Sequence, residues 1–250
     1  MTEHGYRWSL EPAALALAHD RVDAWSVRLD VGAEQAAYLA KLLSPDEQAR
    51  AARFRFNEHR RRFIVARGVL RALLGQYLNR PPERIRFTYS PAGKPALEID
   101  ESVRFNVSHS HEMAVYAVTY KREVGIDLEF MRPLDDMERL AAGCFSAREN
   151  AVWRRLPEVH RQEGFFNCWT RKEAYIKALG QGLSYPLDQF DVSLKPGEPA
   201  RLLSVTGKPQ EATRWTFQAF NPGKNYVAAL AVEGQGWRFE CWQWSHASVN

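Results

Sequence analysis

The sequence predicts an α+β fold built from two similar halves, each with one strand, a set of helices and then three strands. Hydrophobic patterns with periods of 2 and 3.6 residues follow each other in the same order twice, and no long linker or low-complexity segment separates the two runs. A length of 250 residues suits two closely packed units. We place their boundary near Lys121–Glu123, which gives an N-terminal subdomain over 1–122 and a C-terminal subdomain over 123–250.

The first half opens with a strand and continues with helices. The hydrophobic pattern predicts a strand over 22–29 and a helix over 33–43 that Ser44-Pro45 ends. A further helical run extends from Pro45 to Leu78 with a break near Asn57. Three strands follow, over 85–89, 103–107 and 114–120.

The second half repeats this order. It begins with a strand over 124–130, followed by helices near 135–142 and 146–156, where Ser146 and Glu149 fit a capping box. The helix that contains Trp169 ends at Leu179-Gly180, because glycine readily adopts the conformation that terminates a helix. The last strands are expected over 190–194, 215–220, 226–232 and 237–244.

Positive charge is concentrated in one stretch of the chain. The net charge is +4, but Arg50 to Arg71 contains eight arginines and one acidic residue, Glu58, for a net +7, so the remainder is about −3. The arginines alternate with apolar residues, as in an amphipathic helix with a basic face. That face could be an ordinary solvated surface or a phosphate-binding surface, since arginine binds phosphate oxygens bidentately.

Three acidic residues and one lysine are the strongest candidates for a functional site. Side chains alternate along a strand, so Asp127 and Glu129 lie on one face of 124–130. Trp169, Glu173 and Lys177 follow at i, i+4 and i+8, hence on one stripe of a helix. Carboxylates that converge with a lysine indicate a hard metal ion and an anionic, phosphorylated ligand.

Each of these residues also has a plainer interpretation. Asp127 and Glu129 could lie on the solvent face of an edge strand whose apolar residues face the core. Lys177 could be only the i+4 ion-pair partner of Glu173. Lys94 projects from a turn that glycine and proline define and that could be an ordinary hairpin loop. Ser108, His109 and Ser110 end a strand and could hold an anion or form a simple surface loop.

Several classes of protein are not supported. There is no Gly-x-Gly-x-x-Gly or P-loop motif, no zinc-ligand spacing and no Gly-x-Ser-x-Gly elbow. We expect neither a membrane span nor a secretory signal. The three cysteines, Cys144, Cys168 and Cys241, are widely spaced and odd in number, which favours free thiols in a reducing cytoplasm.

Four segments in register resemble the Sfp-type 4′-phosphopantetheinyl transferases. They are Gly93–Pro95, Phe105–Ser110, Gly125–Glu129 and Trp169–Lys177. The resemblance extends from about Val22 to Val232. It implies two similar α/β subdomains in a pseudo-twofold arrangement, monomeric, with coenzyme A bound between them.

The resemblance also implies roles for individual residues. Asp127, Glu129 and Glu173 would bind Mg²⁺, and Lys177 would contact the coenzyme A phosphates. Ser108 and His109 would hold the nucleotide phosphates, and Lys94 would line the adenine side. The 3′-phosphate would lie near Arg50, Arg53 and Arg62, although Arg60 or Arg61 could replace Arg62.

The expected reaction transfers the 4′-phosphopantetheine arm of coenzyme A to a serine of an apo acyl, peptidyl or aryl carrier protein and releases 3′,5′-ADP. Glu173 would be the general base, and Asp127 and Lys177 would complete the catalytic group. The segment 130–134 is a candidate for part of the carrier-docking surface. Alternatives are a nucleic-acid-binding protein that uses Arg50–Arg71, another Mg²⁺-dependent phosphotransferase, or a homologue that only binds coenzyme A.

Overall fold

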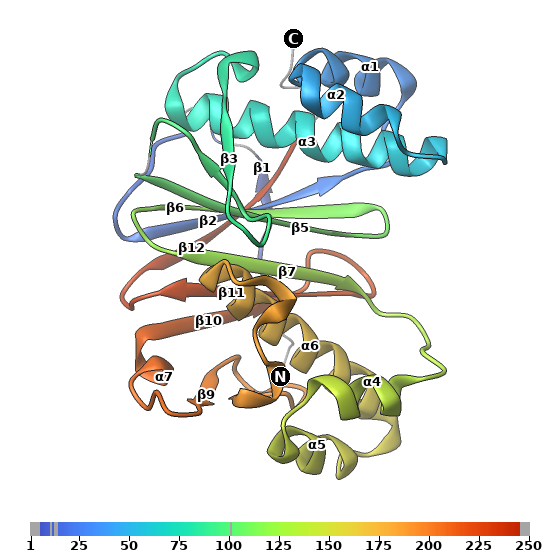
Figure 1. Ribbon diagram of the computed structural model, residues 1–250, viewed down its shortest axis with the longest axis vertical. Helices are drawn as coiled ribbons and strands as arrows, with labels where there is room; N and C mark the ends of the chain where they lie inside the picture. The colour runs from blue at the N-terminus through green and yellow to red at the C-terminus, as the bar shows by residue number, and fades with distance from the viewer. Residues whose placement is uncertain (1–5, 11, 13–14, 101, 246–250) are drawn as a thin grey trace.

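The fold has four layers, with two sheets packed face to face and helices on the outer side of each (Figure 1). The computed structural model describes residues 6–10, 12, 15–100 and 102–245. One hydrophobic core lies between the first sheet and its helices, a second between the two sheets, and a third between the second sheet and its helices. Strands buried on both faces explain why several of them are almost continuously apolar.

The N-terminal half consists of one strand, three α-helices and a group of strands. Its elements are β2 (Arg21–Arg28), α1 (Ala33–Lys41), α2 (Pro45–Ala52), α3 (Asn57–Leu78), the 3₁₀ turn η1 (Pro82–Arg84), β3 (Phe87–Tyr89), β4 (Pro95–Leu97), β5 (Val103–Ser110) and β6 (Met113–Tyr120). The expected break near Asn57 is present, since residues 53–56 separate α2 from α3. The short strand β4 was not predicted, because three residues beside a proline give no periodic signal.

The C-terminal half follows the same order. Its elements are β7 (Val124–Phe130), α4 (Met137–Cys144), α5 (Ala147–Arg154), α6 (Glu158–Leu179), η2 (Gly182–Ser184), η3 (Leu187–Gln189), β8 (Phe190–Val192), β9 (Leu202–Val205), α7 (Glu211–Arg214), β10 (Trp215–Phe220) and β11 (Tyr226–Glu233). The capping box of Ser146 and Glu149 is formed at the start of α5. Gly180 ends α6 in the left-handed conformation, as predicted.

The two halves match element by element, which confirms the predicted α+β fold with two similar parts. The order β2-β6-β5 in the first sheet corresponds to β7-β11-β10 in the second, and all these pairs are antiparallel. The main helices α3 and α6 each have 22 residues. Each half therefore presents one strand edge and one long helix to the region between them.

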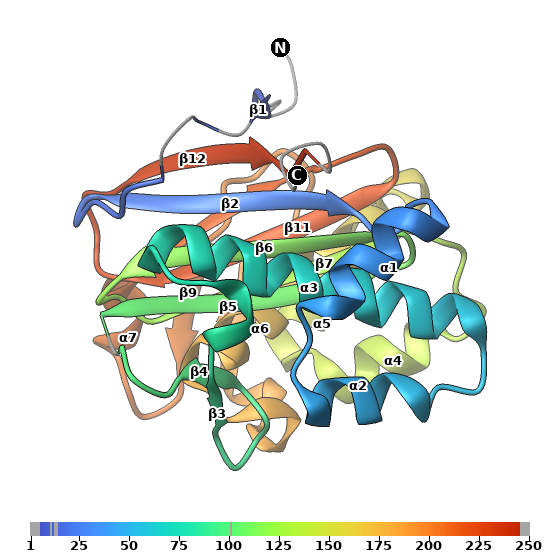
Figure 2. The same cartoon turned by 90° about the horizontal axis from the view of Figure 1, so that it is seen from above.

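The last strand does not stay in the second half. β12 (Arg238–Gln243) pairs in parallel with β2 of the first sheet, and β1 (Ser9–Leu10) pairs with β12 (Figure 2). The strand predicted over 237–244 is therefore present, but its pairing with the first sheet was not predicted. Pairing between distant strands leaves no local sequence pattern. The subdomain boundary near residue 122 stays a prediction.

Contact between α6 and β7 fixes the geometry of the second half. A Cβ atom added to Gly125 would lie 2.0 Å from the carbonyl oxygen of Ala174 and 2.3 Å from the amide nitrogen of Ala178. Only glycine allows the helix backbone to approach the strand this closely. The face of β7 that carries Asp127 and Glu129 consequently lies against α6, while Val124, Ile126 and Leu128 face the other sheet.

Two further features concern the helices and the cysteines. Among the described residues, no helix combines the length and hydropathy that crossing a bilayer requires. Cys144, Cys168 and Cys241 all lie in described segments, and each is a free thiol.

Gly125→Ala should destabilise the protein, because the methyl group would meet helix backbone atoms that cannot rotate away. We expect a loss of roughly 1–3 kcal/mol or more, typical of overpacking, measured by chemical denaturation. Gly143→Ala is the control: it lies in α4 with no atom within 4 Å of the added Cβ, so stability should stay equal or rise. Equal stability of both variants would contradict this account of the α6–β7 contact.

Candidate functional site

The three predicted carboxylates come together where β7 meets α6. Asp127 and Glu173 are 3% and 9% exposed, and Glu129 is half-buried. β7 is an edge strand of its sheet, as the plainer interpretation assumed. Its polar face, however, meets α6 instead of solvent, so the acidic residues are enclosed.

Lys177 neutralises part of this charge. Its ammonium group donates to Asp127 Oδ1 at 2.6 Å and to Ser108 Oγ at 3.0 Å. Ser108 Oγ in turn donates to Asp127 Oδ1 at 2.9 Å. Lys177 therefore contacts the strand carboxylate across the interface, rather than acting only as a partner for Glu173 along its own helix.

Side chains of β5 connect the two halves along this line. The Asn106 carboxamide oxygen accepts a hydrogen bond from the Ile126 amide at 2.9 Å. Ser110 Oγ donates to Glu129 Oε2 at 2.9 Å and accepts from the Phe130 amide at 3.1 Å. Alternate residues of β5 thus bond to β7 without a backbone ladder between them, and they orient both carboxylates of β7. Sequence reasoning missed Asn106 and considered Ser110 only as an anion ligand, although the period-two spacing of both with Ser108 was a usable signal.

Burial and mutual repulsion shift the carboxyl groups. Burial raises the pKa of Glu173 to about 7, and the Asp127 carboxylate adds to the rise while Lys177 opposes it. Burial and Asp127 also raise the pKa of Glu129, and hydrogen bonds from Ser110 and Trp169 oppose that rise. A carboxyl group that titrates near neutral pH inside a cleft is suited to proton transfer.

The donor set fits a divalent cation, although no centre is preformed. Asp127 Oδ2 and Glu173 Oε1 are buried without a hydrogen-bond partner, and such atoms normally have one. Oxygen ligands of this type are those that Mg²⁺ binds. In the described part of the chain, no group of three or more His, Cys, Asp or Glu side chains has the arrangement of a complete metal site.

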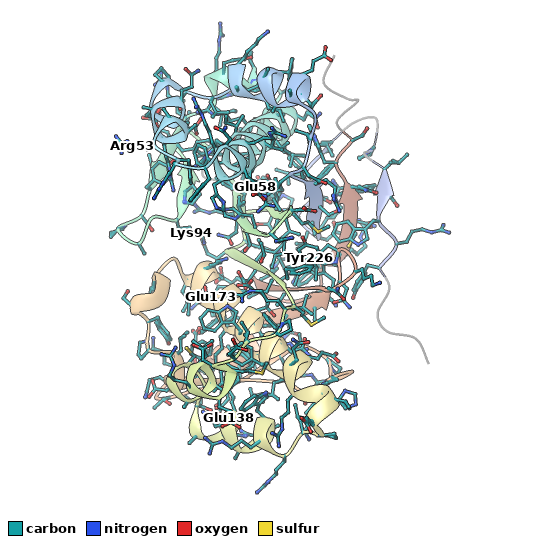
Figure 3. The ribbon with its side chains drawn as sticks, turned by 90° about the vertical axis from the view of Figure 1, so that its right-hand side faces the viewer. Arg53, Glu58, Lys94, Glu138, Glu173 and Tyr226 are labelled. Carbon is teal, nitrogen blue, oxygen red and sulfur yellow. The ribbon has the colours of Figure 1, made fainter. Side chains whose placement is uncertain are left out.

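A cavity opens beside the carboxylates, between the two halves. Its volume is about 340 Å³, and its lining includes Lys94, Asn106, Glu173 and Lys177. The Lys94 ammonium group bonds to Glu123 Oε2 at 3.0 Å and to the Ala178 carbonyl at 2.9 Å, so its turn closes onto the end of α6. Burial lowers the pKa of Lys94. Figure 3 shows Glu173 at the level where the halves meet, with Lys94 just above it.

A second, basic cavity continues the first. It has a volume of about 180 Å³ and is lined by Arg50, Phe63, Ala66, Arg67, Leu70, Pro95, Val107 and His109. Pro95 and Val107 line both cavities, so one groove runs from Glu173 to Arg50. Partial burial and the neighbouring Lys177 lower the pKa of His109. The residue keeps enough exposed surface to face a ligand.

The arginines predicted for phosphate binding separate into two groups. Arg50 lines the basic cavity, whereas Arg53 is exposed and lines neither cavity of the groove. Figure 3 places Arg53 higher on the first half than Lys94. Arg62 is bound to Glu58 at 2.5 Å and lies 4.0 Å from Glu112. Their assignment to a phosphate stays a prediction.

Arg67 was missed by sequence reasoning and lines the same cavity as Arg50. Its Nε lies 3.3 Å from the buried Glu47, and its Nη1 is buried without a hydrogen-bond partner. Glu47 also binds the buried Arg71 at 2.6 Å. The Glu47 carboxylate therefore fixes Arg67 and leaves its Nη1 group available to an anion in the cavity. The only local signal was Glu47 as the N3 residue of a capping box.

Lys172 has a different role from the other lysine of its segment. It is fully buried, and its ammonium group lies 2.8 Å from Glu149 and bonds to the carbonyl oxygens of Leu187 and Phe190. These contacts tie α5 and the chain before β8 to α6. Lys172 supports the helix that carries Glu173 but does not reach the groove.

Ser110→Ala should raise the pKa of Glu129, because it removes a hydrogen bond that favours the carboxylate. The Phe130 amide would also lose its acceptor, for a stability loss of about 1–2 kcal/mol. The measurement is the ¹³C titration of the Glu129 carboxyl group. Ser204→Ala is the control, since it removes a similar hydrogen bond, from Ser204 of β9 to Asp191 of β8, and should leave the Glu129 titration unchanged. An identical Glu129 titration in the wild type and in Ser110→Ala would disprove this role of Ser110.

The stability of the metal-free protein should fall as pH rises from about 4.5 to about 7. Glu173 has a folded pKa of about 7 against an ordinary value of 4.5, so the folded state binds the extra proton in this window. At 1.36 kcal/mol per pH unit, the loss is at most ~3 kcal/mol. Chemical denaturation in EDTA at pH 5 and pH 8 measures it. Glu173→Gln should show a smaller decrease than the wild type; an equal decrease would refute the shift.

Two family profiles match the chain, one in each half. The profile of the 4′-phosphopantetheinyl transferase superfamily matches residues 123–231. A second profile, for the N-terminal part of 4′-phosphopantetheinyl transferases, matches residues 31–121. The two matches meet at residues 121 and 123, close to the proposed boundary between the halves.

Relatives of known name match much of the chain. The 4′-phosphopantetheinyl transferase HetI of Nostoc sp. is 43% identical over 242 residues, which covers 96% of this chain and 99% of the relative. The 4′-phosphopantetheinyl transferase psf-1 of Bacillus pumilus is 34% identical over 169 residues, covering 68% and 71% respectively. A crystal structure of Thermotoga maritima holo-[acyl-carrier-protein] synthase overlaps 45% of this chain and 63% of its own, with 22% identity and a TM-score of 0.36. On the strength of the HetI match, the chain belongs to the 4′-phosphopantetheinyl transferase family of enzymes.

Proposed function

We propose that this protein transfers the 4′-phosphopantetheine arm of coenzyme A to a serine of an apo acyl, peptidyl or aryl carrier protein. The products are the holo carrier and 3′,5′-ADP, and the reaction depends on Mg²⁺. The observation that carries this proposal is the continuous groove that has Arg50 and Arg67 at one end and, at the other, Glu173 and Lys177 beside the carboxylates of β7. Coenzyme A matches such a groove, because its pyrophosphate and 3′-phosphate are separated by the ribose.

The basic end of the groove supports binding of the nucleotide phosphates. Arg50, Arg67 and His109 converge there, and arginine binds phosphate through two parallel hydrogen bonds. His109 has a lowered pKa, so it would be largely neutral near pH 7 until a phosphate favours its charged form. Lys94 and Pro95 would border the adenosine between the two cavities.

The acidic end supports binding of Mg²⁺ and of the pyrophosphate. Asp127, Glu129 and Glu173 would hold the ion, and the partnerless oxygens of Asp127 and Glu173 favour this assignment. Bound there, Mg²⁺ would neutralise charge on the phosphoryl oxygens. Lys177 already contacts Asp127 and Ser108 and would turn its ammonium group toward the same phosphates.

Glu173 is the proposed general base. The serine oxygen attacks the β-phosphorus, a new P–O bond forms, and the bond to the 3′,5′-ADP oxygen breaks. The serine proton passes to Glu173, directly or through a water molecule, and later to solvent. A pKa near 7 allows Glu173 to accept this proton at neutral pH. Positioning and charge stabilisation would supply most of the rate increase.

We also propose that the protein acts as a monomer in the cytoplasm. Both walls of the groove come from one chain, so a second copy is not needed to complete the site. The competing nucleic-acid-binding function leaves the buried carboxylates without a role. A different Mg²⁺-dependent phosphotransferase would share them, and only the reaction product separates it from the proposed function.

Incubation with coenzyme A, Mg²⁺ and an apo carrier should add about 340 Da to the carrier, the mass of one phosphopantetheine arm on serine. Intact-protein mass spectrometry measures this, and EDTA should abolish it. The absence of any mass gain on acyl, peptidyl and aryl carriers, together with tight oligonucleotide binding, would favour the nucleic-acid alternative.

Glu173→Gln should retain the fold but lose most turnover, about 10²-fold or more, as expected for a general base. Circular dichroism checks the fold, and the rate of carrier loading is measured at saturating coenzyme A. Glu138→Gln, an exposed acid on α4, is the control and should load carrier at the wild-type rate. A near-normal rate for Glu173→Gln would remove the proposed role of this residue.

A further inference from the structure

Two phenylalanines are exposed in the turn between α2 and α3. Phe54 is 37% exposed and Phe56 is 58% exposed, which is unusual for two large apolar side chains so close in sequence. Four exposed arginines belong to the same turn and to the start of α3. Together these residues form what we call the α2–α3 surface: Arg53, Phe54, Arg55, Phe56, Arg60 and Arg61.

The positive charge of the α2–α3 surface is not balanced locally. Within the described residues, none of its four arginines has an acidic partner within 4 Å. Glu58, the one acidic residue of the segment 53–61, is paired with Arg62. By sequence, the stretch 50–71 is +7 while the rest of the chain is about −3. An exposed cluster of this kind attracts an acidic partner over several ångströms.

The α2–α3 surface lies outside the groove proposed for coenzyme A, since none of its six residues lines either cavity. The surface nevertheless borders the groove, because Phe54 packs against Phe63 at 5.4 Å between ring centroids and Phe63 lines the basic cavity. Arg50 covers the Phe63 ring at 5.2 Å. A molecule that delivers an acceptor to the groove would therefore pass close to this surface.

The arrangement of the rings favours a protein partner over a nucleic acid. Base stacking requires a free aromatic face, but the Arg55 guanidinium lies over the Phe56 ring at 5.5 Å and Phe54 packs on Phe63. Nucleic-acid sites also spread positive charge along a path of many phosphates, whereas this cluster is confined to one turn and the start of α3. Aromatic residues and arginine are, by contrast, enriched in protein interfaces.

The segment 130–134 offers less apolar surface than its sequence suggests. Met131 and Leu134 pack against the C-terminal core, and Phe130 is covered by His111, stacked at 4.8 Å, and by Tyr226. Among the candidate contact residues there, Arg132 is the exposed one that carries charge. The α2–α3 surface presents both exposed rings and unpaired cations.

We propose that the α2–α3 surface docks an acidic segment of the carrier protein beside the groove, with Phe56 in apolar contact and Arg55 in charge contact. This inference rests on the proposed function, since it names the partner of that site. Charge at the rim of an interface mainly raises the association rate, and a partly exposed aromatic residue supplies contact area.

The double variant Arg55→Glu/Phe56→Ser tests this proposal in steady-state carrier loading. The KM for the carrier should rise about tenfold or more through lost attraction and contact, while the KM for coenzyme A and the melting temperature stay unchanged. The wild-type KM for the carrier should also rise with salt, more steeply than that of the variant. Arg155→Glu/Val159→Ser is the matched control, because it also reverses the charge of an exposed arginine and replaces an exposed apolar side chain, Val159 at 84% exposure, by serine.

The outcomes separate the inference from the function on which it rests. An unchanged carrier KM in the double variant, with normal loading by the wild type, would overturn the docking surface alone. A rise in the KM for coenzyme A of the same size would also overturn it, because the surface would then belong to the nucleotide site. Failure of the wild type to load any carrier would remove the proposed function and this inference with it.

Discussion

The contact between the α6 backbone and Gly125 determines where the catalytic chemistry can occur. Because the helix lies directly on β7, the side chains two and four residues beyond Gly125 face the stripe of α6 that carries Glu173 and Lys177. A helix normally packs about 10 Å from a sheet on a layer of side chains. Here that layer is missing at one point, and the acidic residues beside it are brought close together instead of being separated by apolar groups.

This approach has an electrostatic cost that the structure only partly offsets. Buried carboxylates are expensive unless a cation or a hydrogen bond compensates them. Lys177 and Ser108 compensate one oxygen of Asp127, and Ser110 compensates Glu129. Glu173 has no such donor at Oε1 and responds with a pKa of about 7. The residual imbalance favours a ligand that brings positive charge, which is the physical reason to expect a metal ion together with an anionic substrate.

Internal duplication explains how one chain forms both walls of the groove. α3 and α6 have the same length and the same place in their halves, but Arg67 of α3 lines the basic cavity, whereas Glu173 and Lys177 of α6 line the other one. The strand facing α6 supplies carboxylates, and the β5 edge of the first half supplies the hydroxyl groups that bind them and the Asn106 carboxamide that binds the β7 backbone. The two halves thus supply different charged groups to the groove, with Arg50, Arg67 and His109 at one end and Glu173, Lys94 and Lys177 at the other.

Local patterns predicted most of the elements, whereas contacts between distant segments could not be predicted. β7 and β10 begin and end where the alternation of residues predicted, and the Ser146 capping box formed as expected. The stripe of Trp169, Glu173 and Lys177 follows from helix geometry alone.

By contrast, β12 joins the first sheet through pairing with residues more than two hundred positions away, for which the sequence carries no local signal. Arg67 lies at the groove because the buried Glu47 holds it there. Lys172 lies away from the groove because Glu149 and two carbonyl oxygens bind its ammonium group. In both cases the residue type was visible in the sequence, and its partner decided its role.

The same reasoning separates the arginines of the basic stretch into three kinds. Arg71 is buried and bound to Glu47, so its charge is neutralised inside the fold. Arg50, which lies over Phe63, and Arg67, which Glu47 holds, line the basic cavity, where an anion can reach them. Those of the α2–α3 turn are exposed, and their attraction acts at long range and is weakened by salt. A single run of positive charge therefore contains a structural part, a ligand-binding part and a part suited to an approaching partner, and only burial and contacts distinguish them.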